Sequence, residues 1–427
     1  MIDESRPLRL ALVGCGGRGI GVSREFQEHL KLARVTALYD VAAAGIERAK
    51  QAFPEATPCK SLEELGRRED VDAAFIATTD DTHVDCALAL KPFKKHLLVE
   101  KPLAISIADC DRLVNGFAGE RETVQMVGLC MRYNNAMQRV HQLVSNGMIG
   151  EILCADCIDH VSVGGTYYFH HWMSRRNKVI GLLLQKGCHS LDFISWVIGS
   201  KAARVHSFGG LDYYGGDEPA EKVCHECNEF ADCSERQERF IQLDYVQKPQ
   251  RKPDFCAYSR EVDVNDNAVV NVLYESGAKL SYTECHFSPD YERKFCFIGT
   301  KGQIELSCPH GRAPEIAVSF RLRPGKVMRE TVEMDPGGHQ GGDPAMLREF
   351  VAAINERRKP LTDFAAGREG AVIAISAEES IESGQVVEVT DPDGTPRKVT
   401  RRKGRSRELS RTELLDRTPL YAKRAGG

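Results

Sequence analysis

Hydrophobic and polar positions follow two different periods along this chain, and the change of period divides the chain into two parts. In the first part, short apolar runs are separated by segments with apolar residues at helical spacing. Strands are predicted at residues 10–13, in a run that ends at Asp40, and at 72–79, 96–101 and 123–129, with helices at 83–90 and 107–117 among them. Strands that alternate with helices imply right-handed crossovers. The pattern therefore predicts a doubly wound parallel α/β sheet.

Beyond residue 150 the period becomes that of antiparallel hairpins. Residues 268–275 and 278–283 alternate around Ser276-Gly277, and residues 295–299 and 303–306 flank a Thr-Lys-Gly turn. Helices are predicted at 179–198, at about 344–356 and at about 365–383. The second part is therefore predicted to be an α+β domain with a large, open-faced, mainly antiparallel sheet. Because one face of that sheet needs cover, we expect a homo-oligomer, a dimer or a tetramer, built on it.

Length and composition set further limits on the class of protein. A chain of 427 residues is too long for one core, and we predict domains at 1–133 and 134–395, followed by a basic C-terminal tail at 396–427. The 42% of hydrophobic and 28% of charged residues are typical of soluble globular proteins. A formal net charge of -4 argues against a nucleic-acid partner.

The start of the chain and its cysteines bear on the compartment. Residues 1–8 contain two acids and a proline, where an export signal would have a basic start and an apolar core, and we expect no membrane span. The 15 cysteines, an odd and scattered number, are more typical of reduced thiols than of disulfides. These features favour the cytoplasm.

A glycine motif follows the first predicted strand. Gly14, Gly16 and Gly19 form G-x-G-x-x-G, and Asp40 stands 21 residues after Gly19. The first glycine permits a tight turn, the second lets the backbone approach a pyrophosphate, and the third lets the next helix pack closely. Asp40 is placed to accept from the ribose hydroxyls, and its charge would repel a 2′-phosphate. The motif therefore predicts a Rossmann domain that binds NAD in preference to NADP.

Lys101 is the first candidate catalytic residue. The ligand-binding edge of a parallel sheet lies at the carboxyl ends of its strands, where Thr78, Thr79, Glu100 and Lys101 are predicted to lie. Oxidation of a secondary alcohol needs a group that takes the hydroxyl proton, and a positive nicotinamide would push a nearby ammonium toward neutrality. A strand-capping surface lysine is the alternative.

A second candidate segment lies within the predicted helix at 179–198. Spacings of three place Lys186, His189 and Asp192 along one helix face, and Gln185 stands four residues before His189. We expect His189, alone or with Lys186, to act as a base. The alternatives are a hydrogen-bonded core histidine at 189 and a helix-internal partner at Asp192.

Aromatic and basic residues before this helix suit a sugar, because flat rings with polar edges match the faces and hydroxyls of a pyranose. Packing under a loop is the alternative for each of them. His339 lies in a Gly-rich segment that capping of the next helix by Asp343 would also explain. The predicted substrate-binding residues are Arg132, Tyr133, Trp172, Arg175, Gln185, Asp192 and His339.

Taken together, the motifs resemble the Gfo/Idh/MocA (glucose-fructose oxidoreductase/inositol dehydrogenase-like) family. The resemblance rests on the glycine motif, Thr78-Thr79-x-x-x-His83, Glu100-Lys101-Pro102 and His189-Ser190-Leu191-Asp192. It implies that Lys101 binds the substrate hydroxyl and the nicotinamide ribose, on a sugar, cyclitol or derivative. Many family members have an aspartate where Gln185 stands. The residues expected to bind the cofactor are Gly14, Gly16, Gly17, Arg18, Gly19, Asp40, Thr78, Thr79, His83, Glu100 and Lys101.

Four cysteines form a separate candidate site. Cys224, Cys227 and Cys233 have the spacing C-x2-C-x5-C, and Cys256 follows. Four thiolates suit a tetrahedral structural zinc, which would stabilise a loop poor in apolar residues. Reduced thiols in a long loop are the alternative.

Three functions are compatible with these features. The first is an NAD-dependent dehydrogenase that oxidises a secondary hydroxyl of a sugar, cyclitol or glycoside. The second resembles a branch of the family that cleaves glycosides with a tightly held NAD, by oxidation, elimination and reduction, for which Lys186 would supply an extra base. The third is a non-catalytic NAD-binding sensor, against which Lys101 and His189 argue.

Overall fold

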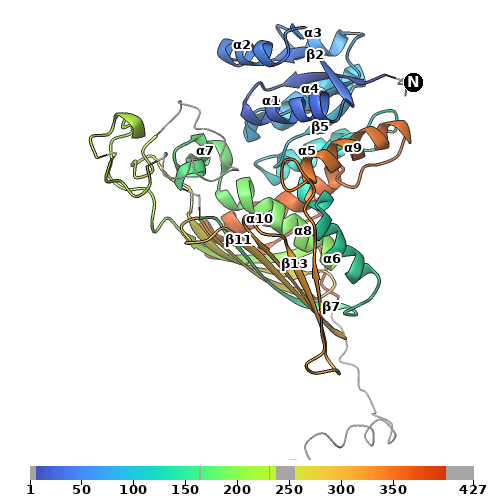
Figure 1. The fold of residues 1–427 in the computed structure, drawn as a ribbon, viewed down its shortest axis with the longest axis vertical. Coiled ribbons are helices and arrows are strands. Elements are labelled where there is room, and N and C mark those ends of the chain that lie inside the picture. Colours follow the sequence, from blue (N-terminus) through green and yellow to red (C-terminus); the bar gives the residue numbers. More distant parts are fainter. Residues whose placement is uncertain (1–5, 163–164, 230, 237–254, 401–427) are drawn as a thin grey trace, which may run out of the picture.

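A computed structural model describes residues 6–162, 165–229, 231–236 and 255–400, and two β-sheets organise this part of the chain (Figure 1). The first sheet has six parallel strands in the order β3-β2-β1-β4-β5-β6. The strands are β1 (Leu8–Val13), β2 (Ala33–Tyr39), β3 (Thr57–Pro58), β4 (Ala73–Ile76), β5 (His96–Val99) and β6 (Gln125–Val127). This confirms the predicted doubly wound parallel sheet.

Short helices connect these strands. They are α1 (Gly17–Arg24), α2 (Ala43–Ala52), α3 (Leu62–Arg67), α4 (His83–Leu90) and α5 (Ile107–Gly116). Serine N-caps set two of the starts, because the Ser61 and Ser106 hydroxyls accept from the backbone N–H groups of Glu64 and Asp109.

The second sheet has nine strands in the order β14-β13-β12-β11-β7-β10-β9-β8-β15. Only the β7–β10 pair is parallel among the described strands, which confirms a mainly antiparallel sheet. The strands are β7 (Ile152–His160), β8 (Ala202–Gly210), β9 (Asn267–Tyr274), β10 (Lys279–Cys285), β11 (Glu292–Gly299), β12 (Gly302–Pro309), β13 (Glu315–Phe320), β14 (Val327–Thr331) and β15 (Val387–Glu388).

Helices cover one face of the second sheet, as predicted. They are α6 (Asn135–Ser145), α8 (Cys188–Ile198) and α10 (Phe364–Ser383), and Figure 1 shows them between the two sheets. The strand positions that point the other way include Phe208, Val269 and Ile298, which are 67%, 40% and 41% exposed. This face has no covering layer in the described part of the chain.

The helix predicted at 179–198 is not continuous, because it is broken near its start. A short helix, α7 (Arg176–Val179), ends before Ile180, whose φ of 57° is left-handed, and a π-helical segment spans Leu183–Gly187 before α8 begins. A Cβ at Gly181 would lie 1.7 Å from a carboxylate oxygen of Glu378, so the chain passes very close to α10 there. This close approach explains why a continuous helix is not formed.

Helix α9 (Gly342–Asn355) belongs to the predicted second domain by sequence but packs against the first sheet. Its residues Met346, Leu347 and Phe350 belong to the same buried core as Leu10 and Phe75 of the first sheet. A segment from the second half of the sequence therefore completes the core of the nucleotide-binding half. Because the side chain of Asp343 lies in the first turn of α9 and Gly341 is the N-cap, the predicted cap at Asp343 is wrong.

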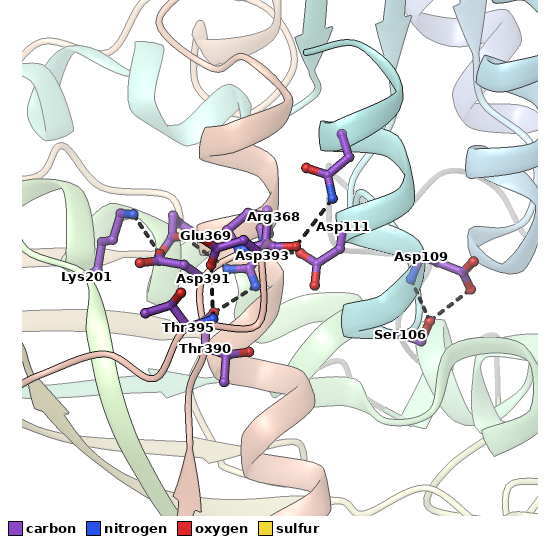
Figure 2. A network of polar contacts seen from close by, with 12 residues as sticks. Ser106, Asp109, Asp111, Lys201, Arg368, Glu369, Thr390, Asp391, Asp393 and Thr395 are labelled. Carbon is purple, nitrogen blue, oxygen red and sulfur yellow. Dashed lines mark hydrogen bonds and ion pairs between the residues drawn. The ribbon is translucent and has the colours of Figure 1, made fainter.

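A buried polar network joins α5, α10 and the end of the described chain (Figure 2). Arg368, which is 1% exposed, donates to Asp111 at 2.5 Å and to the Thr390 carbonyl at 2.8 Å. Arg397 donates to Glu369 from both terminal nitrogens. The first residues of the predicted tail, 396–400, thus pack on the protein, and 401–427 lie outside the described residues.

Candidate active site

The glycine motif lies at the carboxyl end of β1, where it forms a tight turn. Gly14 has a φ of 89°, and a Cβ there would lie 2.5 Å from the Ala77 carbonyl oxygen. A Cβ at Gly19 would lie 2.3 Å from the Gly14 oxygen, whereas one at Gly16 would meet no atom within 4 Å. Gly16 precedes α1, whose start has no side-chain cap. Open space before uncapped N–H groups fits a pyrophosphate.

Asp40 is held against this loop. Its Oδ2 accepts from the Cys15 backbone N–H and its Oδ1 from that of Ala42, both at 2.7 Å. The carboxylate therefore stands beside the glycine motif, as a ribose-binding acid requires. Thr78, after β4, adds a buried hydroxyl without a partner in the described residues. These residues fit NAD.

His83 and Thr79 make hydrogen bonds within the turns that follow β4 and β5. The His83 Nδ1 donates to the Pro102 carbonyl at 2.8 Å, and its Nε2 lies 3.3 Å from the Thr78 carbonyl. Burial lowers the pKa of His83, which favours the neutral ring. The Thr79 carbonyl accepts from the Thr82 hydroxyl at 2.8 Å. Both predicted cofactor residues thus support the turns that carry Thr78 and Lys101.

Arg18 connects the nucleotide loop to α9. Its guanidinium donates to both oxygens of Asp343, at 2.7 and 2.8 Å, and its Nε donates to Glu100 at 2.7 Å. Burial would raise the pKa of Asp343, but the charges of His339 and Arg18 hold it well below its usual range. Gly17 is the first residue of α1, directly before this arginine.

Lys101, after β5, reaches across to the second half of the chain. Its Nζ donates to the Gln185 side-chain oxygen at 2.5 Å and also to the Gln185 backbone carbonyl. The Gln185 amide donates in turn to both oxygens of Asp80, at 2.9 and 3.2 Å. Burial, with added repulsion from Asp81 and Glu100, raises the pKa of Asp80 to about 7, against the attraction of Lys101.

His189 is buried close to these groups, with an exposed fraction of 4%. Its Nδ1 has no hydrogen-bond partner within the described residues. Burial lowers its pKa well below the usual value, and the positive charges of Lys101 and His339 lower it further. A neutral imidazole with a free nitrogen is able to accept a proton.

His339 approaches His189 from the loop before α9. The two ring centroids are 5.6 Å apart, and the His339 Nδ1 lies 3.0 Å from Asp343. With Cys130, the two histidines form the one group of three potential metal ligands found in the described ranges, with ligand atoms within 4.8 Å of one another. The structure therefore brings His339, predicted to bind substrate, to the candidate base.

Lys186 and Asp192, predicted to lie along one helix face with His189, each bind a charged partner. The Lys186 ammonium donates to both oxygens of Asp159, at 2.8 and 2.9 Å, and Ser190 and Arg293 also donate to that carboxylate. The π-helical segment contains Lys186, and it alters the helical spacing on which the prediction relied. An ammonium bound in this way is not a free base.

Asp192 is paired with Arg132 across the two halves of the protein. Two guanidinium nitrogens donate to its two oxygens, at 2.6 and 2.8 Å, and both side chains are buried. The hydroxyl of Tyr133 lies 3.0 Å from that of Thr362. These polar groups bind partners within the protein, and a role in substrate binding stays a prediction for Arg132, Tyr133 and Asp192.

The predicted aromatic cradle packs around its own core. Trp172 packs against a cluster that contains Tyr168, Phe169 and Tyr214. The Arg175 guanidinium lies over the Phe255 ring, 5.1 Å from its centroid. In the described ranges, the observed contacts of Trp172 and Arg175 are with this cluster and its loop. A role in substrate binding stays a prediction for both.

Two family profiles cover most of the chain. A profile described as "Oxidoreductase family, NAD-binding Rossmann fold" matches residues 8–129, and one described as "Oxidoreductase family, C-terminal alpha/beta domain" matches residues 141–389. The chain belongs to the Gfo/Idh/MocA family. The resemblance in the motifs is thereby confirmed.

Several relatives of this Gfo/Idh/MocA protein are known. A protein named as an oxidoreductase, YteT of Bacillus subtilis (strain 168), is 25% identical over 382 residues, which are 81% of this chain and 88% of YteT. Inositol 2-dehydrogenase of Gluconacetobacter diazotrophicus is 30% identical over 147 residues, 34% of this chain and 44% of that enzyme. Levoglucosan dehydrogenase, solved with NADH and levoglucosan, has a similar fold, with a TM-score of 0.71 and 18% identity over 90% of this chain and 100% of that one.

The sequence predictions did not include the pairing of three carboxylates with the site residues. Asp80, Asp159 and Asp343 lie 105, 27 and 325 residues from their partners Gln185, Lys186 and Arg18. Asp80 directly follows the Thr78-Thr79 pair at the carboxyl end of a strand. Because ligands bind at that edge of the sheet, its position in the sequence could have marked it as a site residue. The partners themselves depend on the tertiary fold.

The four cysteines of the predicted zinc site lie in one loop region. Val223 pairs with Phe255, so Cys224 and Cys256 follow paired residues, and the Cys227 N–H donates to the Cys224 carbonyl. No three of the sulfur atoms were found within 4.8 Å of one another in the described chain. Structural zinc stays a prediction.

Proposed function

We propose that this Gfo/Idh/MocA protein oxidises a secondary hydroxyl of a sugar, cyclitol or glycoside, with NAD as the hydride acceptor. The observation that carries the proposal is the convergence of Lys101, from the nucleotide-binding half, and His189, from the other half, beside an NAD-type loop. The names of the inositol and levoglucosan dehydrogenases support a polyhydroxylated substrate.

Each group of residues has a separate role in the proposed reaction. NAD, when bound, supplies the ring that accepts the hydride. The glycine loop and Asp40 hold the cofactor, while Lys101 binds the reacting hydroxyl and takes its proton. His189, neutral and buried, is the second group that accepts this proton. Arg18 fixes Glu100 and Asp343 around them, which preserves the positions on which rate depends.

A second candidate is the redox-neutral cleavage of glycosides. Elimination requires an additional proton-transfer group, and the two imidazoles with centroids 5.6 Å apart supply one without Lys186. Because Lys186 is bound to Asp159, His339 takes the place of the extra base considered from the sequence.

We also infer a homo-oligomer in a reducing compartment such as the cytoplasm. The uncovered face of the second sheet, with Phe208 and Val269, supports association. All 15 cysteines are free thiols, which supports a reducing compartment. Among the described helices, none is both long and apolar enough to cross a membrane.

The experiment that tests the proposal combines cofactor and product analysis. The purified protein is denatured and any nicotinamide released is identified. Intact protein is incubated with NAD and a panel of sugars, cyclitols and aryl glycosides. Growth of NADH absorbance supports the dehydrogenase, and release of aglycone without net NADH supports the second candidate.

A further inference from the structure

We propose that Asp80 is a positioning residue that orients Gln185 toward Lys101 and supplies the counter-charge of the Lys101 ammonium. The inference rests on the proposed function, because it assumes that Lys101 takes the substrate proton. Asp80 lies four residues after the end of β4, in the helical turn Asp80–Thr82, and is only 4% exposed. Nothing in the motif pattern assigns it a role.

The hydrogen bonds define which way the Gln185 amide faces. The Gln185 amide nitrogen donates to both oxygens of Asp80, and in the ionised form of Asp80 neither oxygen is able to donate in return. The amide oxygen must then face the opposite way, where it accepts from the Lys101 Nζ. Asp80 thus fixes the acceptor for Lys101 through one intervening side chain.

The charges around Asp80 make Lys101 its partner. Two other carboxylates act on it, and each has its own cation: Asp81 pairs with Lys178 at 3.1 Å, and Glu100 pairs with Arg18 at 2.7 Å. Lys101 is the cation whose attraction opposes the rise in the pKa of Asp80. The two form a pair that is bridged by an amide in place of direct contact.

The arrangement differs from the histidine–aspartate pair that the family resemblance implies. Gln185 stands at the usual aspartate position, and the His189 Nδ1 is left without a partner in the described chain. In this protein the buried carboxylate is Asp80, which is linked through Gln185 to Lys101 and not to His189. We infer that the anionic charge which stabilises the protonated base has moved from the histidine to the lysine.

The chemical consequence concerns one proton. When the substrate is oxidised, the hydroxyl O–H bond breaks and its proton joins the neutral Lys101 amine, while the hydride and its electron pair go to NAD. The negative charge of Asp80 stabilises the resulting ammonium. Removal of that charge is expected to favour the neutral amine over the ammonium.

The test compares Asp80→Asn with a neighbouring carboxylate variant, Asp81→Asn. In Asp80→Asn, we expect the acidic limb of the pH profile of kcat/KM to move down by about one pH unit and kcat to fall about tenfold. Asp81→Asn should keep the wild-type limb. A purely structural role for Asp80 would lower kcat without moving the limb, and that result would overturn the proposal.

A second variant, Gln185→Leu, covers the case in which Asp80→Asn does not fold. It removes the bridge, so the limb should move in the same direction, and the double variant should show no further shift. Thermal melting and NAD binding check that each variant is folded. An unmoved limb in Gln185→Leu also overturns the proposal.

A direct readout separates this inference from the proposed function. The rate at which an acylating reagent labels Lys101, followed by mass spectrometry against pH, reports when the amine becomes neutral. A labelling curve that moves to lower pH in Asp80→Asn supports the pair even if no substrate is oxidised. A labelling curve identical to the wild type would refute the pair even if the enzyme is an active dehydrogenase.

Discussion

Lys101 and Gln185 form the contact that joins the two halves of the candidate site. The lysine follows a strand of the parallel sheet, and the glutamine lies in the π-helical segment before α8. A hydrogen bond of 2.5 Å between their side chains holds the ammonium at the junction of the two halves. The chemistry proposed here depends most on this lysine.

Replacing Lys101 with Met keeps the length of the side chain and removes its amine. We expect kcat/KM to fall by about 10²- to 10⁴-fold, since a proton-transfer group contributes about that factor. The dissociation constant of NAD, measured by calorimetry, should change little. Lys178→Met is the matched control, because Lys178 is half-exposed and pairs with Asp81. Unaltered turnover in Lys101→Met would refute its role.

At the scale of single residues, the sequence predicts the positions of those residues whose place depends on the neighbouring strand alone. The glycines, Asp40 and Lys101 each follow a strand, so their places could be inferred from the pattern. Lys186 and Arg132 could not, because their roles depend on Asp159 and Asp192, which other elements bring to them. A buried ion pair between distant segments leaves no periodic signal.

Helix α9 and the loop before it place His339 next to His189 in the candidate site. His339, Gln340 and Gly341 all have positive φ, of 51°, 55° and 85°. This turn places His339 near His189 and starts α9 with Asp343 in its first turn. The sequence predicted the helix but not the sheet on which it packs. Hydrophobic spacing shows that one face of a helix is buried, but it does not show which sheet covers that face.

Asp343→Asn is expected to destabilise the protein by about 1–3 kcal/mol at pH 7. The carboxylate has a lowered pKa in the folded state, so its contribution is complete above the unfolded pKa of about 4 and is lost as the pH falls below it. The difference between wild type and variant in the free energy of unfolding should therefore shrink below about pH 4.

Chemical denaturation from pH 3 to 8 measures this difference. Asp335→Asn, an exposed position of the same loop, is the control and should match the wild type throughout. A gap between Asp343→Asn and wild type that persists unchanged at pH 3 would contradict the assignment.

The whole molecule is stabilised by polar links between segments that are far apart in sequence. Arg368 joins α10 to α5 and to the carbonyl of Thr390, as Figure 2 shows. Arg368→Ala should lower the free energy of unfolding by about 2–4 kcal/mol, because it leaves a partly buried Asp111 without its cation. Arg112→Ala, an exposed arginine of α5, should cause no measurable change. Equal stability of the two variants would contradict this role.

The uncovered face of the large sheet predicts self-association. Light scattering should give a mass that is two or four times the 47.4 kDa of one chain. Phe208→Glu places a charge where the side chain is 67% exposed in one chain, and it should shift the protein to monomer. A monomeric wild type would refute the proposed oligomer.

At the scale of the molecule, both sheets could be predicted, because periods of two and of 3.6 residues are visible in the sequence. The break at Ile180 could not, because it results from the close approach of Gly181 to Glu378. Such contacts between segments decide where a continuous apolar pattern is interrupted.

The most direct test of the central claim follows NADH absorbance and aglycone release together, for wild type and Lys101→Met, with NAD and a panel of sugars, cyclitols and aryl glycosides. The account predicts that NADH accumulates with at least one polyhydroxylated substrate in the wild type and that Lys101→Met abolishes it. Aglycone release without net NADH, or NADH formation that survives the loss of Lys101, would contradict the account.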